Sequence, residues 1–335
     1  MTTNLSTSAG ISQRTNVYAE REMLKHAAPV IVLDKTGPLI KPMPKNKGVN
    51  IKFRRPIPFE AATVPLQEGV TPTGTAFRYE DVSGSLEQYG QVGIITDVIE
   101  DTHEDPVLND LVKQLGENIA RTKEALNYAE LIGGTNVFYA NGSARTDVNT
   151  VISLSKLRAV ARALKAQKAM KITQVLDGSP NYQTRPVEAS WVAVAHTDVE
   201  ADIRNLAGFI PVAEYGNRRT ISEYEIGSVE EFRFLTSPDL DPVEDAGGAV
   251  AGLTIKSTAG TSADIYPVLI FGKEAWGMVP LRGQGSVEPT IIPVNQKTKD
   301  DPLGQRGYAG WKLWHLAMIL NELWMARLEV AVTDL

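Results

Sequence analysis

The chain contains no cysteine among its 335 residues, which excludes disulfides, thiolate metal sites and cysteine nucleophiles. It has no run of ~18 apolar residues, so the sequence predicts no membrane-spanning helix. The N-terminal stretch MTTNLSTSAGISQRT is polar and lacks the apolar core of a secretory signal. The formal net charge is −6, so bulk attraction to nucleic acid or to an anionic membrane is not expected.

The familiar catalytic motifs are also missing. There is no G-x-x-x-x-G-K-[ST] phosphate loop and no G-x-S-x-G nucleophile elbow. We therefore predict no enzyme activity, no catalytic residue, no metal and no cofactor. HTDVEAD (residues 196–202) could supply metal ligands, but a strand-to-helix turn capped by Thr197 or Asp198 explains it better. His26 and His315 have no partner nearby in sequence, and we interpret them as packing or surface residues.

One acidic segment keeps an alternative open. TDVIEDTHEDP contains six side chains that can bind a hard cation: Asp97, Glu100, Asp101, His103, Glu104 and Asp105. A metal-dependent hydrolase using this cluster is the alternative from a different functional class. We favour an acidic helix start, because carboxylates are stabilised by the positive end of the helix dipole.

What the chain does have is two stretches of opposite charge. Residues 41–58 carry six Lys or Arg and no acid, whereas residues 80–110 carry nine Asp or Glu and no Lys or Arg. EAATVPLQEGVTPTGTAF (60–77) lies between them and has too few large apolar residues to build a core. We predict an open hairpin that must lie on another surface, most simply on a second copy of the chain. We also predict charge pairing of the basic stretch with acidic residues of the same or a neighbouring subunit.

Hydrophobic periodicity predicts three helices. Asp105 as N-cap, Pro106 at the first turn and apolar residues at three- and four-residue steps indicate a helix of ~40 Å over 105–132, ended by Gly133-Gly134. The stripe consists of Leu108, Leu111, Val112, Leu115, Ile119, Leu126 and Ala129. Shorter helices are expected over 15–28 and 153–170. The last has an outward basic face of Lys156, Arg158, Arg162, Lys165 and Lys168, which could contact DNA or an acidic partner but is more simply a solvated face.

Alternating and continuous apolar runs predict the strands. These are VIVLDKTG (30–37), NIKFRRP (50–56), a returning strand or pair over 77–95, WVAVA (191–195), EEFRFLT (230–236), IYPVLIFG (265–272), 311–319 and 328–332. Residues 311–319 are apolar on both faces, so periodicity alone leaves a buried helix open as the alternative for this segment. From Trp191 onward we expect short strands and helices to alternate, and DVEADIRNLAG (198–208) is part of this alternation. We expect TPTGT (71–75) to be a turn-like tip and DLDPVEDAGGAVAG (239–252) to be an exposed acidic loop.

Six segments resemble one protein family. They are GIITDVIEDTHEDPVL, GGTNVFYANG, SLSKLRAVARALKAQKAMKIT, AVAHTDVEADIRNLAGFIPVAEYG, MVPLRGQGSVE and DPLGQRGYAGWKLW. In this order they resemble the major capsid proteins of tailed double-stranded DNA bacteriophages, in the group related to the coliphage N-four capsid protein. The resemblance extends over roughly residues 10 to 332. Encapsulin shells use the same fold, but these segments favour the phage family.

The resemblance implies an α+β fold of the Hong Kong 97 type. Its parts would be an N-terminal arm (1–47), an extended E-loop (48–98), a P domain (99–188) with a spine helix over 105–132, an A domain (189–292) and a C-terminal return to the P domain (293–335). It also implies a structural role: hexamers and pentamers of an icosahedral head that encloses dsDNA without sequence-specific recognition. The residues we assign to the assembly interface are Lys52, Arg54, Arg55, Glu68, Pro72 and Arg78.

The same resemblance implies partners and a location. The chain would be part of the virion, assembled in the bacterial cytoplasm with scaffolding, portal and decoration proteins as partners. There is no lysine between Lys52 and Lys113, so the E-loop tip has none for a crosslink between subunits. The sequence shows no long helical N-terminal extension that could act as a fused scaffold, so we expect a separate scaffolding protein unless a longer precursor is processed.

Overall fold

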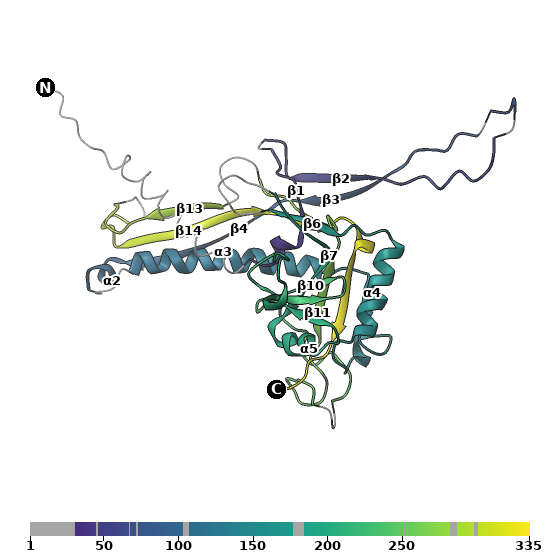
Figure 1. Cartoon of the computed structure of the whole chain (residues 1–335). Coiled ribbons are helices and arrows are strands. Elements are labelled where there is room, and N and C mark those ends of the chain that lie inside the picture. Colours follow the sequence, from purple (N-terminus) through teal and green to yellow (C-terminus); the bar gives the residue numbers. More distant parts are fainter. Residues whose placement is uncertain are drawn as a thin grey trace.

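The computed structural model describes residues 31–44, 46–66, 68–71, 73–102, 107–176, 184–250, 252, 254–281, 287–297 and 301–335. Figure 1 shows an elongated arrangement built along helix α3 (Val107–Leu131). A long hairpin of β2 (Asn50–Pro56) and β3 (Tyr79–Ser85) projects at one end, and the short helix α2 (Asp97–Thr102) lies at the other. The structure combines helices with several separate sheets, which corresponds to the α+β fold class that the family resemblance implies.

A three-stranded antiparallel sheet packs along α3. Its order is β13 (Val287–Ile292), β14 (Arg306–His315), β4 (Glu87–Thr96). The apolar side chains in this interface come from both elements: Val112, Leu115 and Ile119 from the helix and Ala309, Trp311 and Leu313 from β14. A Cβ on Gly93 of β4 would lie 2.7 Å from Leu111 Cδ1, so a larger residue there would force the Leu111 side chain to shift. The helix and the sheet therefore form one stiff unit.

The larger sheet lies beside the C-terminal end of α3. Its order is β5 (Val137–Tyr139), β16 (Met325–Val330), β11 (Tyr266–Phe271), β7 (Thr184–His196), β10 (Phe232–Ser237), β9 (Glu225–Val229) and β8 (Phe209–Pro211), and β6 (Ile172–Leu176) pairs with β7. Every residue of β10 and of β11 is buried, as expected for central strands covered on both faces.

The two faces of this sheet are covered by different elements. Trp191, Ala193 and Ala195 of β7 point to the cluster that contains Leu157, Val160 and Leu164 of helix α4 (Leu154–Ala166). Val192 and Val194 point to the other cluster, with Tyr128 and Leu131 of α3. Successive side chains of β7 therefore point to opposite faces of the sheet, and each set packs into one of the two clusters.

Short elements complete the chain. Strands β1 (Leu39–Ile40), β12 (Trp276–Met278) and β15 (Ala317–Ile319) form a small sheet. The turns η1 (Leu33–Thr36), η2 (Arg145–Asp147), η3 (Thr197–Val199), η4 (Val212–Glu214) and η5 (Glu322–Trp324) and helix α5 (Glu200–Arg204) connect the larger elements.

Most of the predicted elements are confirmed. NIKFRRP is strand β2, the returning segment is the pair β3 and β4, and residues 311–319 lie in β14 and β15. Helix α4 is confirmed, with Leu157, Val160, Ala161 and Leu164 buried, but it ends at Ala166 rather than near 170. Helix α3 is described from Val107, so its predicted N-cap Asp105 and Pro106 lie outside the described residues, as does the helix expected over 15–28.

Four local predictions are wrong. VIVLDKTG contains the 3₁₀ turn η1 instead of a strand, because Val32 and Leu33 bond to a side chain of α3 and not to a strand. Ala129 is exposed, since the buried face of α3 turns toward Asn127 and Tyr128 at this end.

The other two concern loops. The described residues of 239–252 form a loop, but it is only partly exposed: Leu240 is fully buried, and Val243 and Ala249 pair with Ile265 and Ser262. The turn described in the long hairpin lies at residues 68–69, where Gly69 has φ +78°, and not at TPTGT.

Candidate assembly surface and buried polar network

The hairpin is anchored at its root. Phe53 of β2 pairs in register with Val82 of β3, and Phe53 is only 9% exposed. Both side chains pack into a cluster with Met43, Val279 and Met318 from the body of the subunit. The root is therefore part of the folded core, and it fixes the direction in which the hairpin projects.

Charged side chains pair across the two hairpin strands. The register places Arg54 opposite Asp81 and Arg55 opposite Glu80. Arg54 Nε lies 2.8 Å from Asp81 Oδ1, Lys52 Nζ lies 3.3 Å from Asp81 Oδ2, and Arg55 is ion-paired with Glu80. The hydrogen bond from Arg54 lowers the pKa of Asp81. The predicted charge pairing is thus found within one subunit, where it holds the two strands in register.

Beyond the root, the hairpin leaves the body of the protein. After the backbone hydrogen bond from Ile57 N to Arg78 O, the described residues between them pair with no strand, and all of them are exposed. The large apolar side chains in this loop are strongly exposed: Phe59 58%, Val64 82%, Leu66 78%, Val70 60% and Phe77 53%. We call residues 57–78 the projecting loop. The rings of Phe59 and Phe77 lie 6.0 Å apart between centroids at an interplanar angle of 51°, so they contact each other across the base of this loop.

The predicted interface residues therefore divide into two groups. Lys52, Arg54 and Arg55 are engaged in the ion pairs of the hairpin. Glu68 and Arg78 are exposed on the projecting loop, whereas Pro72 lies outside the described residues. The signal for this surface in the sequence was the shortage of core-forming residues between two charged stretches.

The acidic segment carries no metal site in the part of the chain that is described. Asp97 Oδ1 accepts a hydrogen bond from the Val98 N–H at the start of α2. His103, Glu104 and Asp105 lie outside the described residues, and elsewhere among the described residues no three His, Asp or Glu side chains are placed to bind an ion together. Among the described helices, none is long and apolar enough to cross a membrane.

HTDVEAD is a strand-to-helix turn, as we expected, but its cap differs. His196 Nδ1 accepts the Asp198 N–H at 3.1 Å, so His196 is the cap and not Thr197 or Asp198. Asp198 Oδ2 pairs with Lys256 Nζ at 2.5 Å, and Asp202 accepts from Thr333. These carboxylates have structural partners.

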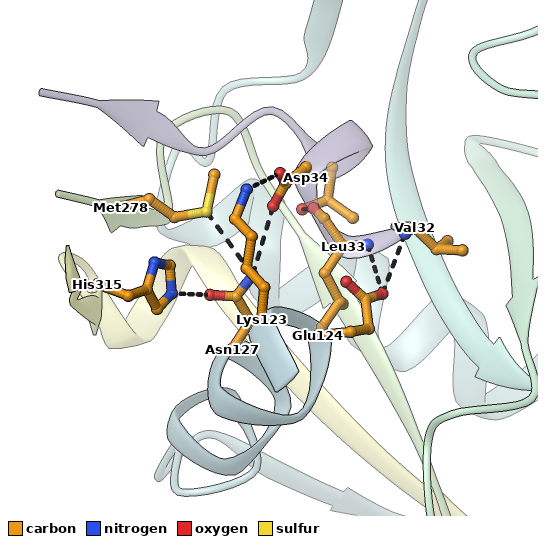
Figure 2. A network of polar contacts seen from close by, with 9 residues as sticks. Val32, Leu33, Asp34, Lys123, Glu124, Asn127, Met278 and His315 are labelled. Atoms are coloured by element: carbon orange, nitrogen blue, oxygen red, sulfur yellow. Dashed lines mark hydrogen bonds and ion pairs between the residues drawn. The ribbon is translucent and has the colours of Figure 1, made fainter. Parts of the chain in front are cut away.

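A buried polar network joins the segment before the hairpin to α3 (Figure 2). Glu124 is fully buried, and its Oε1 accepts the N–H groups of Val32 at 3.1 Å and Leu33 at 2.8 Å. Lys123 is ion-paired with Asp34. Burial raises the pKa of Glu124 to about 8, because a charge there would lose its hydration.

The network continues to the other side of α3. His315 Nε2 and Asn127 Oδ1 are 2.7 Å apart, and the Asn127 side chain also reaches Asp34. Burial lowers the pKa of His315 to about 4, so the ring is neutral near pH 7. Sequence analysis missed Glu124, although it lies four residues after Ala120 on the buried stripe of the helix.

The comparisons with known proteins fit this fold. A family model described as phage capsid protein matches residues 79–328. The chain belongs to the phage capsid protein family. A curated relative, the major capsid protein of Pseudomonas phage KPP21, is 23% identical over 266 residues, which cover 74% of this chain and 67% of the relative.

Solved phage capsids show the same fold. The capsid of Ralstonia phage GP4 matches with a TM-score of 0.67 at 10% identity, over 91% of this chain and 92% of that one. The capsid asymmetric unit of cyanophage Pam1 matches with a TM-score of 0.61 at 13% identity, over 92% of each chain. The Hong Kong 97-type fold expected from the sequence fits these capsids, and the narrower N-four group stays a prediction.

Membership of the phage capsid family makes this protein a structural component of the virion. Neither the hydrolase nor the encapsulin alternative gains support from the comparisons. The functional surfaces of the capsid protein are therefore those that contact other subunits, and the projecting loop is the leading candidate.

Proposed function

We propose that the protein is the major capsid protein of a tailed phage and that its copies form hexamers and pentamers of an icosahedral head around dsDNA. The observation that carries this proposal is the projecting loop. Its apolar side chains lie in water in the single subunit although its root is firmly packed. Burying them on a neighbour would remove this apolar surface from water.

The proposed mechanism is assembly and not catalysis. The ion pairs between β2 and β3 keep the hairpin extended, so the loop reaches beyond its own subunit and lies across a neighbour. Glu68 and Arg78 would contribute polar contacts and Pro72 an apolar contact at that interface, beside the paired Lys52, Arg54 and Arg55. Each such contact is weak, but a closed shell repeats it by symmetry, and the repeated contacts stabilise the particle together.

The proposed domain division is an arm (1–47), an E-loop (48–98), a P domain (99–188), an A domain (189–292) and a C-terminal return (293–335). The hairpin and the projecting loop lie within the second of these regions and support its assignment. The eight-stranded sheet combines strands from the last three, and the boundary between 188 and 189 falls inside β7, so these three regions share one sheet. Further partners in this proposal are scaffolding, portal and decoration proteins, with assembly in the host cytoplasm.

The basic face of α4 could contact DNA only through side chains that are not already paired with acidic residues. Arg158 Nε lies 2.8 Å from Glu230 Oε1, and Lys165 Nζ lies 2.6 Å from Glu231 Oε1. These pairs neutralise part of the basic face. They favour a solvated surface over a dedicated DNA contact, so we propose that the shell encloses DNA without sequence-specific recognition.

The test is direct. The full chain, expressed alone and together with the scaffolding protein of its phage, should sediment as capsomers or shells, and electron microscopy should show closed particles. A strictly monomeric species at every concentration, with and without the scaffolding protein, would contradict the proposal.

A further inference from the structure

A buried carboxyl group of α3 binds the backbone of the segment that precedes the hairpin. Residues 32–36 contain the turn η1 and contact α3 through Glu124, whose Oε1 accepts two backbone N–H groups. We call residues 32–36 the docked segment. Thr36 Oγ1 also accepts the indole N–H of Trp276 at 2.9 Å. Figure 2 shows the docked segment above α3, with the Glu124 side chain pointing up to it.

The docked segment leads directly into the contacts that position the hairpin. From Gly37 the chain runs into β1, which pairs with β12, and then through Met43, which bridges to Leu281, before β2 begins. An anchor at Glu124 is therefore the first of a series of contacts that hold the hairpin root against the body.

The protonation state of this carboxyl must change when the segment leaves. In the docked state Glu124 is fully buried and its Oε2 has no hydrogen-bond partner among the described residues. The two N–H groups that donate to Oε1 compensate for only part of the hydration that an ionised carboxylate loses on burial. The protonated, neutral carboxyl therefore has the lower free energy in the docked state. Undocking would expose Glu124 on the surface of α3, where water can hydrate the charge.

We propose that Glu124 is a proton-sensitive anchor, which takes up a proton when the docked segment is bound and releases it when the segment undocks. Docking is then strongest in acid and weakens as the solution becomes less acidic. The inference does not depend on the proposed function, because it concerns contacts within one subunit.

The surrounding charges act in opposite directions. Asp34, from the docked segment itself, raises the pKa of Glu124, whereas Lys123 on α3 lowers it. His315, from β14, is neutral over most of the range because its pKa is lowered to about 4. Burial outweighs these groups and raises the Glu124 pKa from 4.5 to about 8. The equilibrium constant for docking should therefore fall about tenfold per pH unit between these two pKa values of Glu124 and become constant above about pH 8.

Hydrogen exchange of the full-length, unassembled subunit tests this. The measurement is the protection factor of the peptide covering residues 31–36 from pH 5 to 9, corrected for the intrinsic exchange rate at each pH. Wild-type protection should fall about tenfold per unit up to pH 8 and then become constant. Glu124→Gln keeps an acceptor for the two N–H groups but cannot titrate, so its protection should not vary with pH.

Two controls make the result decisive. Glu130→Gln changes an exposed carboxyl of the same helix and should behave as wild type. Strand β11, whose residues are all buried, serves as an internal reference for global opening. Three results would contradict the proposed role of Glu124. The protection of residues 31–36 could be independent of pH in the wild type, or it could keep the wild-type pH dependence in Glu124→Gln. It could also change in parallel with the protection of β11. If Glu124→Gln does not fold, the wild-type profile against β11 still decides the question.

Discussion

Replacing residues 60–76 with a short Gly-Ser turn should separate subunit stability from shell assembly. Every described residue of the projecting loop is exposed in the single subunit. Removing exposed residues usually changes the free energy of unfolding by no more than about 0.5 kcal/mol. For a domain of this size that corresponds to a melting-temperature shift of about 2 °C or less.

The same replacement should abolish stable shells. Val64, Leu66 and Val70 are each at least 60% exposed, and burying such a side chain on a neighbour contributes about 1.5–3 kcal/mol at most. Losing three of them from every subunit removes several kcal/mol per contact, before the ordering cost of the loop is subtracted. Because the contact is repeated around the whole shell, this loss of binding free energy should prevent stable shells from forming.

A root substitution gives the opposite pattern and serves as the contrast. Phe53→Ala removes a buried ring from the cluster with Met43 and Met318, which should cost about 3 kcal/mol or more and lower the melting temperature of the isolated subunit. The triple variant Val64→Ser, Leu66→Ser and Val70→Ser is a matched control that keeps the loop length. It should resemble the Gly-Ser replacement.

Calorimetry of unassembled subunits and electron microscopy of assembly reactions would be performed on the same preparations. If the replacement unfolds the isolated subunit, the loop belongs to the subunit core. If shells form normally, the assignment of 48–98 as an E-loop that grips a neighbouring copy is wrong.

Three further outcomes are expected. Mature particles boiled in denaturant should run as one band near 36.5 kDa, because the chain has no cysteine and no lysine in the projecting loop; a ladder of multimers would refute this. Reversing Arg54 and Arg55 to Glu should leave the body folded but splay the hairpin and reduce particle yield, and a compensating Asp81→Arg should restore part of it; unchanged yield would contradict the role of the hairpin. Subunit stability should be flat between about pH 4.5 and 6.5 and decline on either side in thermal unfolding; Glu124→Gln should remove the decline at higher pH and turn the flat region into a rise toward pH 6.5.

The signs in the pH prediction follow from the two buried groups. Glu124 has a raised pKa, so its stabilising contribution is full below 4.5 and is lost as the pH rises to about 8. His315 has a lowered pKa, so its contribution is full above 6.5 and is lost as the pH falls to about 4. The two slopes oppose each other between 4.5 and 6.5. A stability profile that rises steadily from about pH 6.5 to 8 would contradict this reasoning.

Local patterns in the sequence determined the long helix, the hairpin strands and the buried central strands. Leu115 and Ile119 recur at helical spacing, and Ile51 and Phe53 alternate with basic residues, so each element shows its buried face in its own periodicity. The projecting loop was also visible, because a stretch that lacks large apolar residues cannot form its own core.

Only the tertiary structure decided the segment at 32–36, the burial of Glu124 and the partners of the hairpin charges. Val32 and Leu33 have strand-like side chains, but their N–H groups bond to a carboxyl 92 and 91 residues away, and no local pattern encodes that contact. Arg54 could have paired with any of several acidic residues later in the chain, and the register of β2 against β3 selected Asp81. Periodicity reports which face of an element is buried, whereas the choice of partner depends on how distant elements pack.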